Sequence, residues 1–456
     1  MATAWGVPAA DGQAVDRADI RPWKAGLAKA VITPARPLWM GGYASRTRPA
    51  EGTLHDLWIK VLALEDEQGR RAVLLTSDLL GVPRQMYEDV IRAVRERYRL
   101  DRSQVLLTAS HTHCGPAIRE SLFDCYALEP GQVADIEAYS DGLEKKMLAA
   151  IGEALSALAP ATLWAGEGTA GFAVNRRNNV EAQVPELLAA GRPLQGPVDH
   201  SVPVLAVRSP DGRLLAVVFG YACHNTTLNF YKWCGDYAGF AQIELEKRHP
   251  GAQAMFWQGC GADQNPLPRR SVELCEKYGT TLAGSADEVL ARPMRPLAPV
   301  LRTGFDFVML DFDGTPTREQ LETLARSDSE IIDRRWARRL LRILDRDGSL
   351  PKQYRYPVAV WRLGDQLWIA LGGEAVVDYA LSFKEKFGRR TWVAGYTNDV
   401  MAYIPSRRVW NEGGYESGAL HVYGQPADRW GRDIEERITR VVERLVDATA
   451  RVAESR

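Results

Sequence analysis

The feature that most constrains the fold is a repeated alternation of apolar strands and amphipathic helices. A strand-like run at 72–78 is followed by apolar residues at helical spacing over 86–98, and then by a second apolar strand at 104–109. Strand, helix and strand in this order form a βαβ unit. Such a unit favours parallel pairing of its strands and a right-handed crossover.

The same arrangement recurs further along the chain. Apolar strands at 214–221, 252–257 and 367–371 precede predicted helices near 238–247, 272–290 and 376–387. We therefore expect an α/β fold, with a mixed or mainly parallel β-sheet core and flanking helices. No low-complexity linker interrupts the pattern. This predicts an N-terminal extension (1–24) and one domain (25–456) that closes with an amphipathic helix within 428–454.

Charge and hydropathy exclude several classes of partner. The 57 basic and 58 acidic residues give a net charge of −1, so we expect no binding of nucleic acid. No apolar run approaches the roughly 20 residues of a spanning helix, so we expect no integral membrane segment. The first 20 residues resemble no leader, which favours the cytoplasm unless a signal peptide has been removed. The six cysteines are too sparse for a disulfide scaffold and are expected to be buried free thiols. The oligomeric state stays open.

Polar clusters follow the predicted strands at the point where each strand ends. These clusters are Asp78, Ser110–His113, Cys223–Asn225, Gln258–Asp263, Gly372–Glu374 and Asn398–Asp399. In α/β sheets, reactive groups gather beyond the carboxyl ends of the strands. We therefore predict that the active site lies there and binds a small molecule.

Histidines are concentrated in these clusters. Only seven occur in the chain, and His111, His113 and His224 lie in the strand-end loops. Imidazole is the commonest zinc ligand, and a catalytic zinc needs about three protein ligands and an open position. Glu374 follows an apolar strand directly, where a carboxylate needs a cationic partner. Each histidine taken singly could instead be a hydrogen-bonded core residue.

Several of these segments together resemble the neutral and alkaline ceramidase family. SHTHCGP at 110–116 resembles the family signature HTHSGP, and YACH at 221–224 resembles its later strand-end histidine. Gly373-Glu374 and NDVMAY at 398–403, followed by Tyr415-Glu416, resemble its glutamate and tyrosine segments. The similarity covers about residues 25–425 in matching order, and HTHxGP is its most specific part.

The resemblance implies a Zn²⁺ cofactor and a set of site residues. It assigns His111, His224, Glu374 and Tyr403 as zinc ligands and places His113 beside the metal, where it would contact substrate. Without the resemblance, Tyr403 would be read as an aromatic core residue. We add Asp78, Gln264 and Asn398 as candidate substrate-binding residues, together with Arg176, which suits a polar or anionic substrate or is simply part of an exposed basic loop.

Two departures from the family pattern affect the expected mechanism. The family carries a nucleophilic serine in a GDxSPN loop, whereas this chain reads GADQNP at 261–266, with Gln264 in place of the serine. The family also has a C-terminal immunoglobulin-like domain, whereas this sequence ends on a predicted helix. We therefore expect attack by zinc-bound water, with Asp263 or His113 moving the proton. A Cys260 thiolate, activated in a strand-to-helix turn, is the covalent alternative.

Three functions are consistent with these residues. The first is zinc-dependent hydrolysis of an amide, most plainly an N-acyl bond, because the resemblance points to an amidase. The second is zinc-dependent hydrolysis of an ester, lactone or glycosidic bond in a polar substrate. The third is a catalytically inactive homologue that binds metal or carbohydrate.

Overall fold

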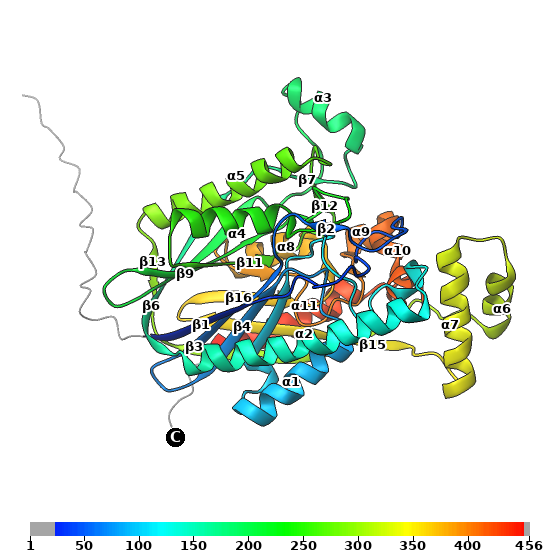
Figure 1. The fold of residues 1–456 in the computed structure, drawn as a ribbon, viewed down its shortest axis with the longest axis horizontal. Helices are drawn as coiled ribbons and strands as arrows, with labels where there is room; N and C mark the ends of the chain where they lie inside the picture. Colours follow the sequence, from blue (N-terminus) through cyan, green and yellow to red (C-terminus); the bar gives the residue numbers. More distant parts are fainter. Residues whose placement is uncertain (1–22, 451–456) are drawn as a thin grey trace, which may run out of the picture.

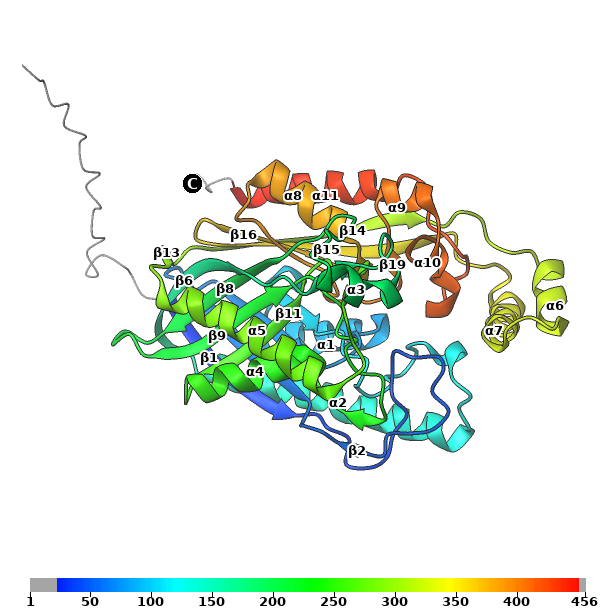
Figure 2. The same ribbon diagram turned by 90° about the horizontal axis from the view of Figure 1, so that it is seen from above.

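Two stacked β-sheets lie between two layers of helices in the computed structural model, which describes residues 23–450 (Figures 1 and 2). The larger sheet has the strand order β11-β9-β8-β6-β1-β3-β4-β5, and β13 pairs with β6. Its strands are β1 (Trp23–Val31), β3 (Trp58–Glu65), β4 (Arg71–Ser77), β5 (Val105–Ala109), β6 (Ala159–Thr169), β8 (Ser201–Arg208), β9 (Leu214–Tyr221), β11 (Gln253–Gln258) and β13 (Arg295–Leu297). The smaller sheet contains β14 (Leu301–Asp311), β15 (Gln353–Leu363), β16 (Gln366–Leu371) and β18 (Trp392–Ala394).

Helices cover the outer face of each sheet. The larger sheet is covered by α1 (Arg84–Tyr98), α2 (Pro130–Ser156), α4 (Asp236–Arg248) and α5 (Val272–Ala291), and the smaller sheet by α8 (Val377–Phe387) and α11 (Ile434–Ala450) (Figure 2). The remaining helices are α3 (Val184–Ala189), α6 (Arg318–Arg326), α7 (Ile331–Asp347), α9 (Arg407–Glu412) and α10 (Tyr415–Gly418). Figure 1 shows α6 and α7 projecting from the body as a hairpin between β14 and β15. Short two-stranded ladders complete the loops: β2 (Gly52–Thr53) with β10 (Lys232–Trp233), β7 (Ala173–Asn175) with β12 (Gln264–Pro266), and β17 (Glu374–Ala375) with β19 (Tyr403–Ile404).

The predicted α/β class is confirmed, and the sheets are mixed rather than mainly parallel. Three βαβ units have the expected parallel pairs, namely β4-α1-β5, β9-α4-β11 and β16-α8-β18. The other pairs within the two sheets are antiparallel. Some of them, such as β3 with β4, are joined by a short turn that leaves no room for a crossover, whereas β1 and β3, and β14 and β15, are separated by longer segments. The helix predicted near 272–290 leads into β13, which pairs antiparallel with β6.

The start of the first strand differs slightly from expectation, whereas the last helix lies where it was expected. Trp23 and Lys24 already belong to β1, so the domain begins two residues before the predicted boundary, and the rest of the extension lies outside the described residues. The closing amphipathic helix is confirmed as α11, which packs Ile434, Ile438 and Leu445 into the core beneath the smaller sheet.

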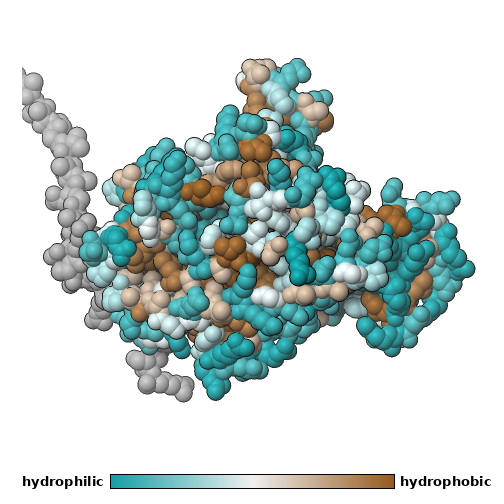
Figure 3. All heavy atoms as spheres, in the orientation of Figure 1, coloured by the Kyte–Doolittle hydropathy of each residue, from teal (hydrophilic) through white to brown (hydrophobic). Residues whose placement is uncertain are grey.

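The surface of the molecule is mixed in character. On the face seen in Figure 3, hydrophobic residues form small groups separated by hydrophilic ones. Among residues 23–450, the helices are too short or too polar to cross a bilayer.

A segment after β18 joins the two edges of the larger sheet. The N–H of Gly395 donates to Gln258 O at the end of β11 (3.1 Å), and the N–H of Asn398 donates to Leu107 O in β5 (2.7 Å). The smaller sheet therefore contributes a connection that brings the carboxyl ends of β5 and β11 to the same place. This junction positions the loops that follow both strands.

Tryptophans form the centre of the core between the sheets. The ring of Trp368 lies 5.2 Å from Trp257, 5.4 Å from Trp392 and 6.2 Å from Trp361, measured between ring centroids. All four side chains are buried. Trp257 comes from the larger sheet and the other three from the smaller one, so this cluster holds the sheets together.

We predict that Trp368→Ala lowers the free energy of unfolding by about 3–5 kcal/mol, because it leaves a large cavity between the sheets. Denaturant unfolding followed by circular dichroism measures this loss. The matched control is Met309→Ala on β14, a side chain that is 41% exposed, which should change stability by no more than about 0.5 kcal/mol. Equal effects of the two changes would contradict the proposed core.

Candidate metal centre

Three imidazoles converge where β5 and β9 end. His111 and His113 follow β5 and His224 follows β9, and one ring nitrogen from each lies within 4.8 Å of the others. The Nε2 atoms of His111 and His113 are 3.1 Å apart. All three side chains are buried. The sequence-based expectation that these loops meet is thus confirmed.

Backbone carbonyls orient two of the rings. Nδ1 of His111 donates to Leu80 O (2.6 Å), and Nδ1 of His224 donates to Gly261 O (2.7 Å). A carbonyl oxygen only accepts, so Nδ1 carries the proton and the Nε2 lone pair is available. This arrangement is typical of histidines that bind a metal through Nε2. His111 has a positive φ of 60°, which turns its ring toward the centre at some cost in backbone strain.

Glu374 brings a fully buried carboxylate to the same point from the smaller sheet. Its Oε2 lies 3.2 Å from His111 Nε2 and 3.1 Å from His224 Nε2, and it accepts a hydrogen bond from the Tyr396 hydroxyl (3.1 Å). Burial opposes its ionisation, but the imidazoles of His111 and His224 hold the pKa of Glu374 well below its usual range. The carboxylate therefore lies directly against the Nε2 atoms of both rings.

The donor set fits a divalent metal ion. Nε2 of His224 and Oε1 of Glu374 are buried and have no hydrogen-bond partner among the described residues. Burial, followed by the positive charge of Arg176, lowers the pKa of His224 to about 4, so its ring is neutral at physiological pH. Neutral nitrogens and a carboxylate that lack proton donors are the ligands that a metal such as zinc satisfies.

Tyr403 is placed beside Glu374 by a short parallel ladder. Residues Glu374 and Tyr403 are partners in the pairing of β17 with β19. The Tyr403 hydroxyl accepts a hydrogen bond from Arg176 (3.2 Å), whose guanidinium also donates to Glu416 (2.7 Å). Burial and the charge of Glu374 raise the pKa of Tyr403 well above its usual value. Arg176 thus contacts the site through Tyr403, and the ligand role of Tyr403 stays a prediction.

His113 lies at the accessible side of the cluster. Its ring packs against Tyr43 with a centroid distance of 4.8 Å, and its Nδ1 has no hydrogen-bond partner among the described residues. Gly42 (φ +98°) allows this approach, because a Cβ there would lie 2.6 Å from the His113 ring. Burial and the neighbouring imidazoles lower the pKa of His113 well below its usual value. The ring is therefore a neutral base.

Asp78 and Asn398 are bonded to the scaffold. The Asp78 carboxylate accepts hydrogen bonds from the N–H of Trp58 (2.9 Å) and from Gln242 (3.3 Å). The Asn398 side chain accepts from the N–H of Leu107 (3.0 Å). Both side chains are buried, and their hydrogen bonds stabilise strands near the centre. Substrate binding stays a prediction for each residue.

Asp263 and Gln264 also have structural partners. Asp263 Oδ1 accepts from the N–H of Val377 (2.9 Å), the first residue of α8, and burial raises the pKa of Asp263 to about 6. Gln264 donates to Ala222 O (2.5 Å) and accepts from the N–H of Asp199 (3.0 Å). These bonds fix the loop around His224. Between the two candidate bases, the geometry favours His113.

The Cys260 alternative is wrong in its physical premise. A thiolate nucleophile requires a lowered pKa, whereas burial raises the pKa of Cys260 well above its usual value. Its side chain belongs to the apolar core under the smaller sheet. All six cysteines are buried, as expected.

Two aromatic residues of the centre were missed by sequence reasoning. Tyr396 donates to Glu374 and its ring packs at a tilt against His111, with a centroid distance of 4.4 Å, and Tyr43 packs on His113. Tyr396 lies two residues before Asn398 in a strand-end loop, so a search for every hydrogen-bonding side chain there would have found it. Tyr43 precedes any recognisable motif and gives no such signal.

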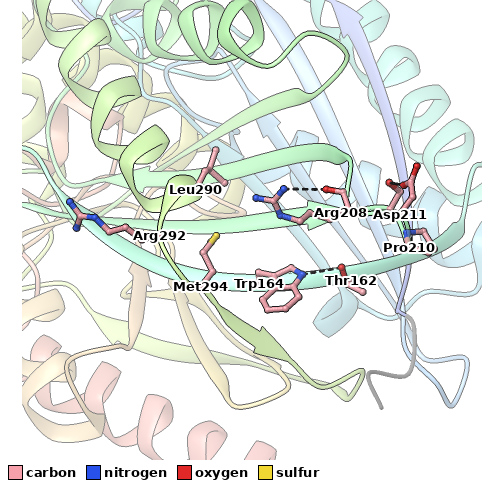
Figure 4. A pocket seen from close by; sticks show the side chains of 10 residues that line it. Thr162, Trp164, Arg208, Pro210, Asp211, Leu290, Arg292 and Met294 are labelled. Atoms are coloured by element: carbon pink, nitrogen blue, oxygen red, sulfur yellow. Dashed lines mark hydrogen bonds between the residues drawn. The ribbon is translucent and has the colours of Figure 1, made fainter. Parts of the chain in front are cut away.

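A cavity of about 400 Å³ lies at the opposite end of the larger sheet. Figure 4 shows Trp164, Met294 and Leu290 beside Arg208 and Asp211. Arg208 pairs with Leu214 at the start of β9, whereas His224 follows the end of that strand. The cavity is therefore separate from the imidazole centre.

Comparisons with known proteins show what this chain is similar to. The neutral ceramidase of Pseudomonas aeruginosa is 26% identical over 264 residues, which is 55% of this chain and 38% of the relative. The chain thus spans about two-fifths of the length of that curated relative.

Solved structures show the same fold. The crystal structure of neutral ceramidase from Pseudomonas aeruginosa superposes with a TM-score of 0.73 at 20% identity, covering 94% of this chain and 74% of that one. A structure described as ceramidase complexed with C2 gives a TM-score of 0.70 at 18% identity, covering 94% and 76%. Residues 23–264, just over half of the sequence, match the family described as neutral/alkaline non-lysosomal ceramidase, N-terminal. By this match, the chain belongs to the neutral/alkaline non-lysosomal ceramidase family.

Proposed function

We propose that this protein is a zinc-dependent hydrolase that cleaves an amide bond of the N-acyl type. The observation that carries the proposal is the buried convergence of His111, His224 and Glu374, with free Nε2 and carboxylate atoms facing one another. Family membership supports amide hydrolysis, because the relatives are ceramidases. A small molecule that enters from the side of His113 is the expected substrate.

Each residue has a defined part in this proposal. His111, His224 and Glu374 would hold the ion, with Tyr403 as a fourth ligand, and a bound zinc would supply Lewis acidity that activates water and stabilises oxyanion charge. Leu80 O and Gly261 O keep the two ligand rings in the binding tautomer. The Tyr396 hydroxyl occupies Glu374 Oε2 and leaves Oε1 free.

His113 is the proposed proton carrier. Its ring is neutral and 9% exposed, and its Nδ1 is free of protein partners among the described residues. An imidazole in this position can accept a proton from attacking water and return it to the leaving amine. Its packing on Tyr43 fixes the ring plane during both transfers.

We predict about one zinc per chain in metal-replete protein, and a loss of most of that metal in His111→Ala and in His224→Ala. Elemental analysis after dialysis against metal-free buffer measures the content. His421→Ala is the matched control, because His421 pairs with Asp428 and Asp333 away from the centre, and it should retain full metal. Full zinc occupancy in either centre variant would refute the ligand assignment.

A substrate panel tests the bond that is cleaved. Zinc-loaded protein is incubated with short polar N-acyl amides, the corresponding esters and lactones, glycosides and long-chain ceramide. We expect the polar N-acyl amides to be hydrolysed fastest and ceramide slowly, because Gln264 stands where the family has its serine. If an ester, a lactone or a glycoside were cleaved fastest, that bond would replace the amide bond in the proposal. If no substrate were turned over at full zinc occupancy, the result would indicate a binding protein.

Two further variants separate the candidate bases. His113→Asn should keep its metal and lower kcat by roughly 10²–10⁴-fold, because the proton carrier is lost. Asp263→Asn should have a much smaller effect on kcat, because Asp263 binds the start of α8. Steady-state rates at matched zinc content give both values. If Asp263→Asn were the more damaging change, the proton role would pass to Asp263.

A further inference from the structure

A second group of reactive side chains lies behind the imidazole centre. Cys234 Sγ is 3.2 Å from His55 Nε2, and the N–H of Asp236 donates to the same sulfur (3.3 Å). Cys234 has no exposed surface, whereas His55 is half-buried. A thiol that faces an imidazole at this distance can transfer its proton to the ring.

The position of Cys234 favours its thiolate form. Cys234 directly precedes Gly235, the cap of α4, so the sulfur lies at the positive end of a 13-residue helix. Burial opposes ionisation, but hydrogen bonds from Cys275 and His55 outweigh it and lower the pKa of Cys234 to about 7. The charge of Cys234 in turn raises the pKa of His55 to about 9, although burial of the ring opposes this shift.

Glycines make room for the imidazole. A Cβ at Gly239 would lie 2.4 Å from Cε1 of His55, and a Cβ at Gly235 would lie 3.3 Å from the same atom. The ring of Phe240 packs edge-on against the other side, at a centroid distance of 5.0 Å. Close packing on the N-terminal part of α4 therefore holds the His55 ring beside the thiol.

A second thiol is in reach of the first. Cys275, in the first turn of α5, is the neighbouring group that does most to lower the pKa of Cys234, and it is buried with it. Among the described residues, three potential metal ligands come close together at His111, His113 and His224. Cys234, Cys275 and His55 do not form a second group of this kind. The contact of the Cys234 thiol with the His55 imidazole therefore points to thiol chemistry at this place.

The thiol pair is connected to the metal centre through the main chain. The hydroxyl of Thr112, between the two histidines, donates to Cys234 O (2.8 Å). The N–H of Cys234 donates to Cys114 O (3.2 Å). A change in the position of residue 234 thus reaches the segment that carries His111 and His113.

We propose that Cys234, His55 and Cys275 form a peroxide-reactive thiol site, in which a hydroperoxide oxidises Cys234 and Cys275 closes a disulfide with it. The cover over Cys234 is His55 and the two-residue ladder of β2 with β10, which can open locally to admit a molecule as small as hydrogen peroxide. The argument for this thiol site does not rest on the hydrolytic function proposed above.

The reaction balances in two steps. The Cys234 thiolate attacks one peroxide oxygen, the O–O bond breaks, and the leaving hydroxide takes the proton of the His55 imidazolium to become water. Sulfur has then lost two electrons to oxygen as a sulfenic acid. The Cys275 sulfur attacks the sulfenic sulfur, the S–O bond breaks, and the hydroxide leaves with the Cys275 proton as a second water, which yields the disulfide.

The test uses the intact, zinc-loaded protein and hydrogen peroxide. Thiols are trapped with iodoacetamide at timed intervals, and the peptides are analysed by mass spectrometry. We expect a Cys234–Cys275 disulfide to form at least about tenfold faster than oxidation at Cys223 or Cys260, because the pKa of each of these two buried thiols is raised. Oxidation of Cys234 at the rate of these two thiols would overturn the proposal.

Variants then test the separate roles. Cys275→Ser should leave a sulfenic acid on Cys234 that dimedone traps, and His55→Gln should slow Cys234 oxidation by about tenfold. Cys125→Ser is the matched control and should oxidise at Cys234 as the parent does. Circular dichroism establishes that each variant is folded. If Cys234 in His55→Gln protein were oxidised at the parent rate, the proposed role of the imidazole would be refuted. The rate of disulfide formation in the parent protein tests the proposal without any variant.

Discussion

Burial of the Glu374 carboxylate is the constraint on which the centre depends. Transfer of a carboxylate from water into the interior costs several kcal/mol unless positive charge and hydrogen bonds compensate. Here the Tyr396 hydroxyl donates one hydrogen bond to Oε2 and the Nε2 atoms of His111 and His224 face the carboxylate, while Oε1 lacks a partner among the described residues. A metal ion at this point would satisfy the carboxylate and both nitrogens together. The polar centre is therefore incomplete as a hydrogen-bonded core, and it fits the proposed ligand set.

The same constraint explains why two sheets are needed. The histidines follow strands of the larger sheet, whereas Glu374 follows β16 of the smaller one. The Trp368 cluster fixes the distance between the sheets, and the segment Gly395–Asn398 ties the smaller sheet to β5 and β11. The geometry of the candidate ligands is thus set by packing between elements that are more than 100 residues apart in sequence.

This division also sets how much the sequence could predict. The three βαβ units were predictable, because periodicity and short spacing determine a local crossover. The antiparallel pairing of β1 with β6, and the pairing of β14 with β15 across the α6–α7 hairpin, were not predictable, because they join distant residues with no local signal. At the site, residue type and strand-end position identified His111, His224 and Glu374. The same reasoning could not distinguish a catalytic base from a structural carboxylate at Asp263. In the structure Asp263 accepts a hydrogen bond from the start of α8, and such a partner is not visible in the sequence.

Hydrogen bonds to main-chain carbonyls orient several side chains of the centre. Leu80 O and Gly261 O select the tautomer of the two ligand rings, and Cys234 O holds Thr112 between His111 and His113. Ligand orientation therefore depends on loops whose side chains never touch the metal position. A disulfide at Cys234 would act on one of these carbonyls, so a chemical change in the thiol site has a short and defined route to the histidine segment. A ligand misplaced by a fraction of an ångström weakens a metal site, so the hydrogen bond between Thr112 and Cys234 O is the contact through which oxidation of Cys234 would reach the histidine segment.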